Sequence, residues 1–154
     1  MSVSITLPKE YGYVLLTATG TFFLSFWHGF RVTAFRRPAT ITYPNSYATP
    51  EQMANADGET KLNMYIFNCA QRAHYNFIEN YNTFLPALLI AGTRYPLVAS
   101  GLGAAWAVCR VLFAIGYTRK DKGKGEGRLV GLGFWLCQLG LYGMTGAIGW
   151  KMIA

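Results

Sequence analysis

The chain has 154 residues, of which 52% are hydrophobic, 16% aromatic and only 14% charged. This composition is too apolar for a typical soluble domain, and the lipid bilayer is the obvious alternative solvent. The formal net charge of +7 suggests a nucleic-acid partner, but the basic residues gather around two connections between apolar segments. A cationic rim at a membrane surface therefore explains the charge better than nucleic acid does.

Four apolar windows are long enough to cross a bilayer, which takes about 20 mostly apolar residues per helix. We therefore predict an all-α integral membrane protein, a four-transmembrane-helix bundle that forms one domain, 1–154. The first window lacks the basic start and the cleavage site of a signal peptide, so we interpret it as a retained signal anchor. The predicted spans cover about residues 12–35, 63–93, 97–118 and 128–152.

The distribution of positive charge predicts the orientation of these spans. Most basic residues flank the first and third connections, residues 36–62 and 119–127, whereas the other side carries only Lys9, Arg94 and Lys151. The positive-inside rule then assigns both connections to the cytosol and both termini to the lumen. The first connection is rich in Pro, Asn, Thr, Ala and Gly, which is typical of a loop.

Short turns and small residues predict how the helices meet. Residues 93–96 form a short turn, so the second and third helices should form an antiparallel hairpin. In the last window Gly140, Gly143, Gly146 and Gly149 recur at intervals of three. Small residues let helix backbones approach closely in lipid, so this band is expected to serve helix packing.

The cysteines and histidines favour neither a disulfide framework nor a metal site. Three cysteines, an odd number, all fall inside predicted spans. No C-x-x-C pair or His/Cys cluster occurs, and His28 and His74 lie on different predicted helices. We therefore expect no bound metal.

The second window carries polar side chains that lipid would not tolerate. At 100° per residue, Arg72, Asn76, Glu79 and Thr83 share one helical face. An ionisable group inside a membrane helix usually faces the bundle or a water-filled cavity, and it is a candidate functional residue. The alternative is an internal network, Arg72 with Glu79 or Asn76, that only holds helices together.

The third window adds a second buried cation, Arg110, on the same face as Tyr117. Two arginines and one glutamate leave a positive charge that an anionic ligand would balance. The ligand implied has a carboxylate, and an amine for Glu79, yet it binds where apolar compounds arrive from the bilayer. Glutathione fits this description, and its thiol needs a nearby cation to form the nucleophilic thiolate.

Four sequence stretches together resemble one known family. The combination covers nearly the whole chain and is similar to the MAPEG family, the membrane-associated proteins in eicosanoid and glutathione metabolism. Within that family it most resembles the type 3 microsomal glutathione transferases. The stretches are Lys9-Glu10-Tyr11-Gly12, residues 67–76 with Glu79, residues 99–106, and Arg110-Val111-Leu112 with Gly116-Tyr117.

The resemblance implies a homotrimer of four-helix subunits that binds glutathione between neighbouring subunits and opens to the cytosol. It also implies residence in the endoplasmic reticulum, with the mitochondrial outer membrane as a second location. Phe113 stands where the leukotriene-C synthase branch of the family has a tyrosine, and Asn80 stands where an aromatic residue often follows the glutamate. Lys124 is a rival to Arg128 for the role of activating cation. The implied roles are glutathione binding by Arg72, Asn76, Glu79, Arg110 and Tyr117, contacts from the adjacent subunit by Arg36 and His74, and thiol activation by Arg128.

The function expected from these residues is that of a glutathione S-transferase with glutathione-dependent peroxidase activity. Its partners would be glutathione, membrane lipid, and a lipophilic electrophile or lipid hydroperoxide. The alternative is a non-catalytic scaffold of the same fold that binds a partner enzyme or a lipid. A channel is disfavoured because the last window offers only Gln138 as a polar pore residue.

Overall fold

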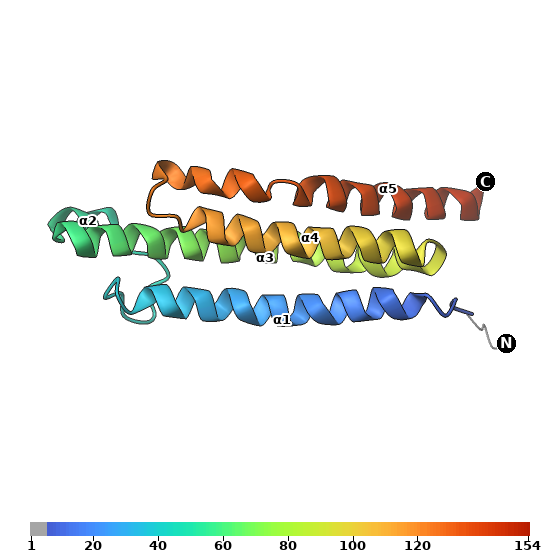
Figure 1. The fold of residues 1–154 in the computed structure, drawn as a ribbon, viewed down its shortest axis with the longest axis horizontal. Coiled ribbons are helices and arrows are strands. Elements are labelled where there is room, and N and C mark those ends of the chain that lie inside the picture. The colour runs from blue at the N-terminus through green and yellow to red at the C-terminus, as the bar shows by residue number, and fades with distance from the viewer. Residues whose placement is uncertain (1–5) are drawn as a thin grey trace.

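The computed structural model describes residues 6–154, and these residues form helices and no strand. Figure 1 shows the long helices lying side by side along one axis, with the start of the first helix and the C-terminus at the same end of the bundle. The helices are α1 (Tyr11–Arg36), α2 (Pro50–Asn55), α3 (Gly58–Arg94), α4 (Pro96–Tyr117), the 3-10 helix η1 (Gly123–Gly131) and α5 (Phe134–Ile153).

Hydropathy of the individual helices identifies fewer spans than the sequence windows predict. Within residues 6–154, α4 alone is long and apolar enough to cross a membrane, and η1 with α5 qualifies as a pair bent by 48°. Helices α1 and α3 contain 26 and 37 residues. At 1.5 Å per residue these are about 40 Å and about 55 Å long, more than the hydrocarbon core of about 30 Å. Their crossing of the membrane stays a prediction.

Part of the connection predicted for residues 36–62 is helical. Helix α2 begins with a capping box, in which the Thr49 hydroxyl accepts from the Gln52 amide and the Thr49 amide donates to Gln52 Oε1. Helix α3 begins at Gly58 because Asp57 caps it, accepting from the Thr60 amide at 2.9 Å. The hydrogen bonds from Thr60 lower the pKa of Asp57, so the charged cap persists at neutral pH and is lost only at acidic pH.

The last predicted span is interrupted where glycines bring backbones into contact. A Cβ added at Gly116 would lie 2.1 Å from the Gly127 carbonyl oxygen, and one at Gly131 would lie 2.3 Å from the Phe113 amide nitrogen. Only glycine allows α4 and η1 to approach this closely. The chain therefore runs along α4 as a 3-10 helix, and α5 starts at Phe134, six residues after the predicted start at Arg128.

The glycine band predicted for helix packing faces mostly away from the rest of this chain. A Cβ added at Gly143, Gly146 or Gly149 would meet nothing within 4 Å, and only Gly140 approaches another helix, at Leu102. The prediction was therefore wrong for packing within this subunit. Close helix approach occurs instead at other glycines, which the spacing argument did not select.

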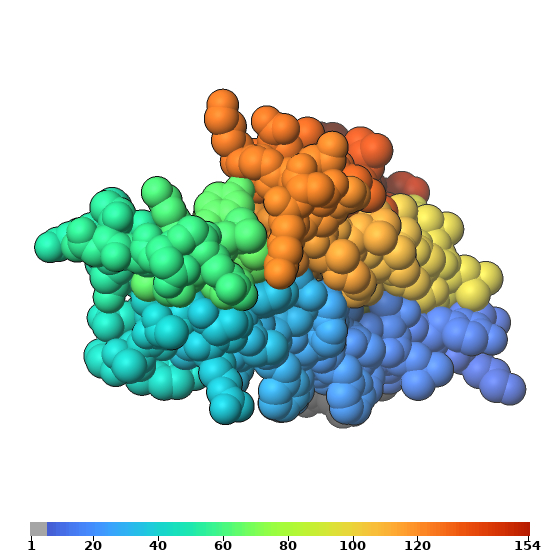
Figure 2. Space-filling model, turned by 60° about the vertical axis from the view of Figure 1, so that its left-hand side comes forward, coloured from blue at the N-terminus to red at the C-terminus, as the bar shows by residue number. Residues whose placement is uncertain are grey.

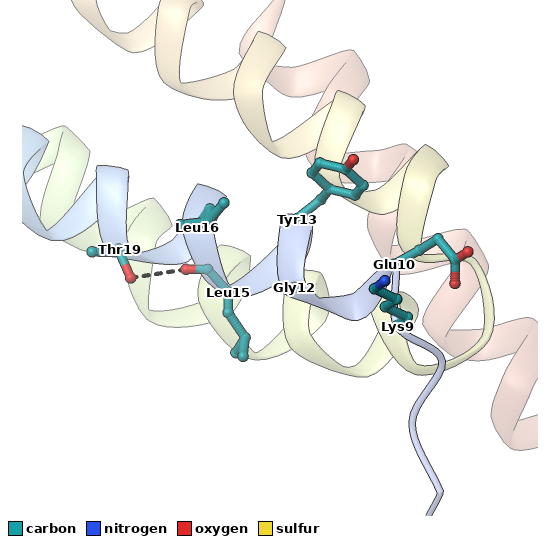
Figure 3. Close-up of a pocket in the computed structure, with 7 residues that line it drawn as sticks. All are labelled: Lys9, Glu10, Gly12, Tyr13, Leu15, Leu16 and Thr19. Atoms are coloured by element: carbon teal, nitrogen blue, oxygen red, sulfur yellow. Dashed lines mark hydrogen bonds between the residues drawn. The ribbon is translucent and has the colours of Figure 1, made fainter.

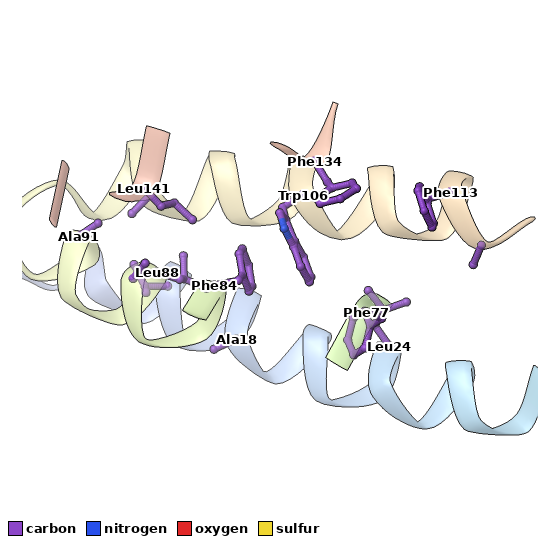
Figure 4. Packing of buried hydrophobic residues seen from close by; sticks show 14 of the residues in the cluster. Ala18, Leu24, Phe77, Phe84, Leu88, Ala91, Trp106, Phe113, Phe134 and Leu141 are labelled. Carbon is purple, nitrogen blue, oxygen red and sulfur yellow. The ribbon is translucent and has the colours of Figure 1, made fainter. Parts of the chain in front are cut away.

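Aromatic side chains fill the space between α3 and α4. The rings of Phe84 and Trp106 stack with centroids 3.7 Å apart, and Phe77 and Trp106 lie 5.7 Å apart. Figure 4 shows these rings between the helices, with Phe113 and Phe134 further along the same core. Close packing and stacking of these rings hold α3 and α4 together.

Replacing Gly116 by Ala is expected to destabilise the bundle, because the new methyl group meets a backbone oxygen that no side-chain rotation can move. We expect a loss of about 1–3 kcal/mol, the usual result of overpacking. The measurement is thermal denaturation of the detergent-solubilised protein. Gly58→Ala is the matched control, since a Cβ there meets nothing within 4 Å. Equal melting temperatures for the two variants would contradict the close contact.

Candidate functional site

Three of the predicted site residues form one connected group on α3. Arg72 Nη1 lies 3.1 Å from Glu79 Oε1, and Asn76 Nδ2 donates to Glu79 Oε2 at 3.4 Å. The Arg72 and Glu79 side chains are 46% and 42% exposed. The helical spacing thus brings together a cation, an amide and a carboxylate, all accessible to a polar ligand.

Arg110 lies behind this group and not among the accessible side chains. It is 0% exposed, and its Nη1 donates to Asn76 Oδ1 at 2.9 Å. The resemblance implies that Arg110 binds the ligand, and this stays a prediction; in this structure Arg110 holds the side-chain amide of Asn76. The remaining stabilisation comes from aromatic faces, since its Cζ lies 4.3 Å from the Phe134 ring centre and 4.9 Å from that of Phe113.

The electrostatic balance of the site is positive. The Nε and Nη2 atoms of Arg110 are buried without a hydrogen-bond partner. Among residues 6–154 the ion pairs are Arg72–Glu79 and Arg119–Asp121, so neither Arg110 nor Arg128 has a carboxylate partner there. Because a buried charge without a counter-charge is unfavourable, this region is suited to an anion.

Arg128 and Tyr117 form a second group at the end of the bundle where α4 connects to η1, called the loop end here. The Arg128 guanidinium lies 5.3 Å from the centre of the Tyr117 ring, and its Nη1 donates to the Gly125 carbonyl oxygen at 2.8 Å. The Tyr65 hydroxyl accepts from the Gly125 amide at 2.7 Å, which joins α3 to η1. The rival cation Lys124 is exposed. Tyr65 was not predicted, and nothing in the sequence marked it.

Two predicted site residues lie elsewhere in this subunit. Arg36 is buried at the end of α1, and its Nη1 donates to the Asn45 carbonyl oxygen at 2.6 Å, so it holds the first connection of its own chain. His74 is half-buried, and its ring centre lies 5.9 Å from that of His28. The contacts across a subunit boundary that the resemblance implies for both residues stay predictions.

A buried polar cluster between α3, α4 and α5 was only partly visible in the sequence. The Trp106 indole donates to Gln138 Oε1 at 2.9 Å, and Gln138 Nε2 donates to the Thr83 hydroxyl at 3.3 Å. Asn80 links this cluster to the candidate site, because its side-chain amide donates to the Asn76 carbonyl oxygen at 2.8 Å. Because these groups satisfy one another, the cluster joins helices and fixes the register of α3 beside α5.

The surface hollow at the other end of the bundle is lined by few side chains that could bind a polar ligand or take part in catalysis. Figure 3 shows it along the start of α1, where Lys9 and Glu10 are the charged residues among otherwise mostly apolar or small ones. It lies at the end of the bundle that holds the chain termini, away from η1 (Figure 1). Polar side chains instead gather at the loop end. Figure 2 shows the connection between α4 and η1 projecting there beside α2 and the start of α3.

Comparison with known proteins identifies the family. The model of the MAPEG family matches residues 14–147, most of the chain. The protein belongs to the MAPEG family. Membership makes it a membrane-associated protein. It also agrees with the all-helical fold and with the many apolar side chains exposed on α1 and α5.

One curated relative of this MAPEG protein is the uncharacterized protein sll1147 of Synechocystis sp. The two are 41% identical over 66 residues, which are 42% of this chain and 45% of that protein. The chain therefore spans less than half the length of the curated relative that it matches. The relative's name states no activity, so substrate and reaction must be argued from this chain's own residues.

The hydrogen bond between Arg110 and Asn76 in this MAPEG protein predicts how substitutions at the two residues change its stability. Asn76→Leu should lower stability by about 1.5–3 kcal/mol, because it removes the hydrogen-bond acceptor of a buried cation. Arg110→Met should cost less, since it also removes that buried charge. The double variant should be more stable than the sum of the single losses predicts. Thermal denaturation of the four proteins in detergent measures this, and strict additivity would contradict the coupling.

Proposed function

We propose that the protein is a membrane-bound glutathione S-transferase with glutathione-dependent peroxidase activity, similar to the type 3 microsomal glutathione transferases. The observation that carries the proposal is the accessible polar face of α3, with the buried cation of Arg110 behind it and the cation of Arg128 beside Tyr117. Arg110 and Arg128 lack carboxylate partners among residues 6–154, while Arg72, Asn76 and Glu79 present both signs of charge. A zwitterionic ligand with surplus carboxylate suits this arrangement.

The polar face offers a complementary partner for each charged group of glutathione. The guanidinium of Arg72 suits a carboxylate, and the carboxylate of Glu79 suits the ammonium group. Asn76 is held by Arg110 and can present its amide at a fixed angle. Tyr117 adds a hydroxyl from α4. Contacts by Arg36 and His74 from an adjacent subunit of a homotrimer are part of the proposal.

Arg128 is the proposed activating residue. A free thiol has a pKa of about 8.5, and a fixed neighbouring cation lowers it by stabilising the thiolate. Arg128 stays charged, is half-buried, and is tied to the η1 backbone beside Tyr117. Lys124 is exposed and has no such support. These contacts favour Arg128 over Lys124 for this role.

The thiolate then has two reactions open to it. With a lipophilic electrophile, the sulfur forms a carbon–sulfur bond and the electron pair moves to the substrate, which takes up a proton. With a lipid hydroperoxide, the sulfur attacks the peroxide oxygen, the oxygen–oxygen bond breaks, and the lipid leaves as an alcohol after protonation. A second glutathione converts the resulting sulfenic acid to the disulfide and releases water.

The proposed setting is the endoplasmic reticulum membrane, with the site facing the cytosol, where glutathione is available. The loop end of the bundle carries the cationic connections, which the positive-inside rule assigns to the cytosol. Lipophilic substrates would enter laterally from the bilayer. The mitochondrial outer membrane is a second candidate location with the same exposure to cytosolic glutathione.

Arg128→Ala is expected to lower kcat/KM with glutathione on the order of 100-fold at neutral pH, since a fixed cation no longer stabilises the thiolate. The loss should shrink as the pH rises toward the thiol's own pKa of about 8.5, where the thiolate forms without help. Steady-state kinetics on purified, detergent-solubilised protein measure both effects.

Lys124→Ala is the matched control and should retain activity. The reverse result, an active Arg128→Ala and an inactive Lys124→Ala, would transfer the role to Lys124. Failure of the unaltered protein to bind glutathione at millimolar concentration would sink the proposal and favour the scaffold alternative. Calorimetric titration with glutathione decides that point independently of any choice of electrophile.

A further inference from the structure

Residues 41–48 of the first connection, called the strap here, are fixed against α3. Asn68 binds the strap twice, because its Oδ1 accepts from the Ala48 amide at 2.8 Å and its Nδ2 donates to the Ala48 carbonyl oxygen at 2.9 Å. Gln71 Nε2 donates to the Ser46 carbonyl oxygen at 2.6 Å. A segment held at consecutive points of its backbone has a defined place on the helix.

Apolar packing and a further hydrogen bond, from Arg36, support the same arrangement. Ile41 and Ala48 are buried in an apolar cluster that includes Phe67 of α3. Arg36 holds the middle of the strap through the Asn45 carbonyl oxygen. The strap is therefore docked by apolar burial at both ends and by hydrogen bonds between them, although its other residues are exposed.

Tyr47 is carried by this docked segment to the polar face of α3. Its two neighbours in the chain are the anchored residues Ser46 and Ala48, and the helix residue that binds Ser46 directly precedes Arg72. The groups that interact electrostatically with the Tyr47 phenol are Arg72, Tyr75, Glu79 and Tyr117. Three of these four belong to the candidate site.

We propose that Tyr47 is a further glutathione-binding residue, whose hydroxyl donates a hydrogen bond to the ligand carboxylate held by Arg72, and that the strap serves to position it. This inference rests on the proposed function. The side chain is 41% exposed, so its hydroxyl is free to turn toward a ligand on the accessible face. No hydrogen bond engages that hydroxyl within residues 6–154 in the absence of a ligand.

The protonation state of Tyr47 suits a donor. Partial burial raises the pKa of its phenol from an ordinary value of about 10, and the opposing influence of the Arg72 guanidinium is smaller. The hydroxyl therefore keeps its proton throughout the range in which the protein would work. A neutral donor beside a cation can bind a carboxylate without adding another charge that needs balancing.

The test is Tyr47→Phe in the full-length, detergent-solubilised protein. Loss of one hydrogen bond to a charged ligand group should raise the Kd for glutathione and its KM roughly 10- to 100-fold. The value of kcat should stay unchanged, because the thiolate is formed elsewhere in the site. A merely structural tyrosine would not produce this split between KM and kcat, and thermal denaturation of the same sample checks folding.

Tyr43→Phe is the matched control, since Tyr43 lies in the same strap, is 71% exposed and contacts Arg36 through its ring alone. It should bind glutathione as the unaltered protein does. A Tyr47→Phe protein with unchanged Kd would overturn the inference while leaving the proposed function intact. Absence of glutathione binding by the unaltered protein would overturn both.

Asn68→Leu tests the strap by a second route, because it removes both hydrogen bonds to Ala48 while leaving Tyr47 in place. We expect a higher Kd for glutathione, and a smaller further effect of Tyr47→Phe in that background than in the unaltered protein. Independent effects of the two substitutions on Kd would show that Asn68 does not position Tyr47, and would overturn the role assigned to the strap.

Discussion

The buried guanidinium of Arg110 is the constraint around which the polar part of this bundle is arranged. A fully buried cation needs a hydrogen-bond acceptor and polarisable neighbours, and it obtains them from Asn76 and from the faces of Phe113 and Phe134. Once the Asn76 oxygen is engaged, its amide nitrogen faces Glu79, which in turn pairs with Arg72. The sequence of contacts from the core to the surface, Arg110 to Asn76 to Glu79 to Arg72, thus begins at the buried charge of Arg110. The Nε and Nη2 atoms of Arg110 remain without a hydrogen-bond partner among the described residues.

Two further features bring the other elements of the site to the same end of the bundle. Glycine backbones allow η1 to run against α4, and this contact carries Arg128 to Tyr117. The strap docks on α3 through Asn68 and Gln71, next to Arg72 in the sequence of that helix. The residues of the candidate site therefore come from α3, α4, η1 and the first connection, while α1 and α5 contribute mainly apolar surface. This division agrees with a MAPEG protein whose outer faces meet lipid.

The sequence predicted the helical fold and the central part of the site, and it failed where contacts depend on close approach of distant backbones. The stripe of Arg72, Asn76 and Glu79 was predictable because residues three and four apart share a helical face. The capping box at Thr49 was also readable, and it marks α2, a helix that composition alone had assigned to a loop. The break before α5 was not predicted, since it depends on how Gly127 and Gly131 meet α4. For the same reason the spacing argument did not select Gly116, Gly127 and Gly131, where the backbones within this chain approach most closely.

What the sequence determined by itself is therefore local: the apolar helical segments, the periodic polar face and the surplus of positive charge. Each of these depends on residues within a few positions of one another, where the helical repeat fixes the geometry. Only the tertiary structure decided that Arg110 lies behind Asn76, that Arg36 holds its own connection, and that Tyr47 reaches the site. Those contacts join residues that no period relates, and they arise from packing of whole helices and from hydrogen bonds between loop and helix.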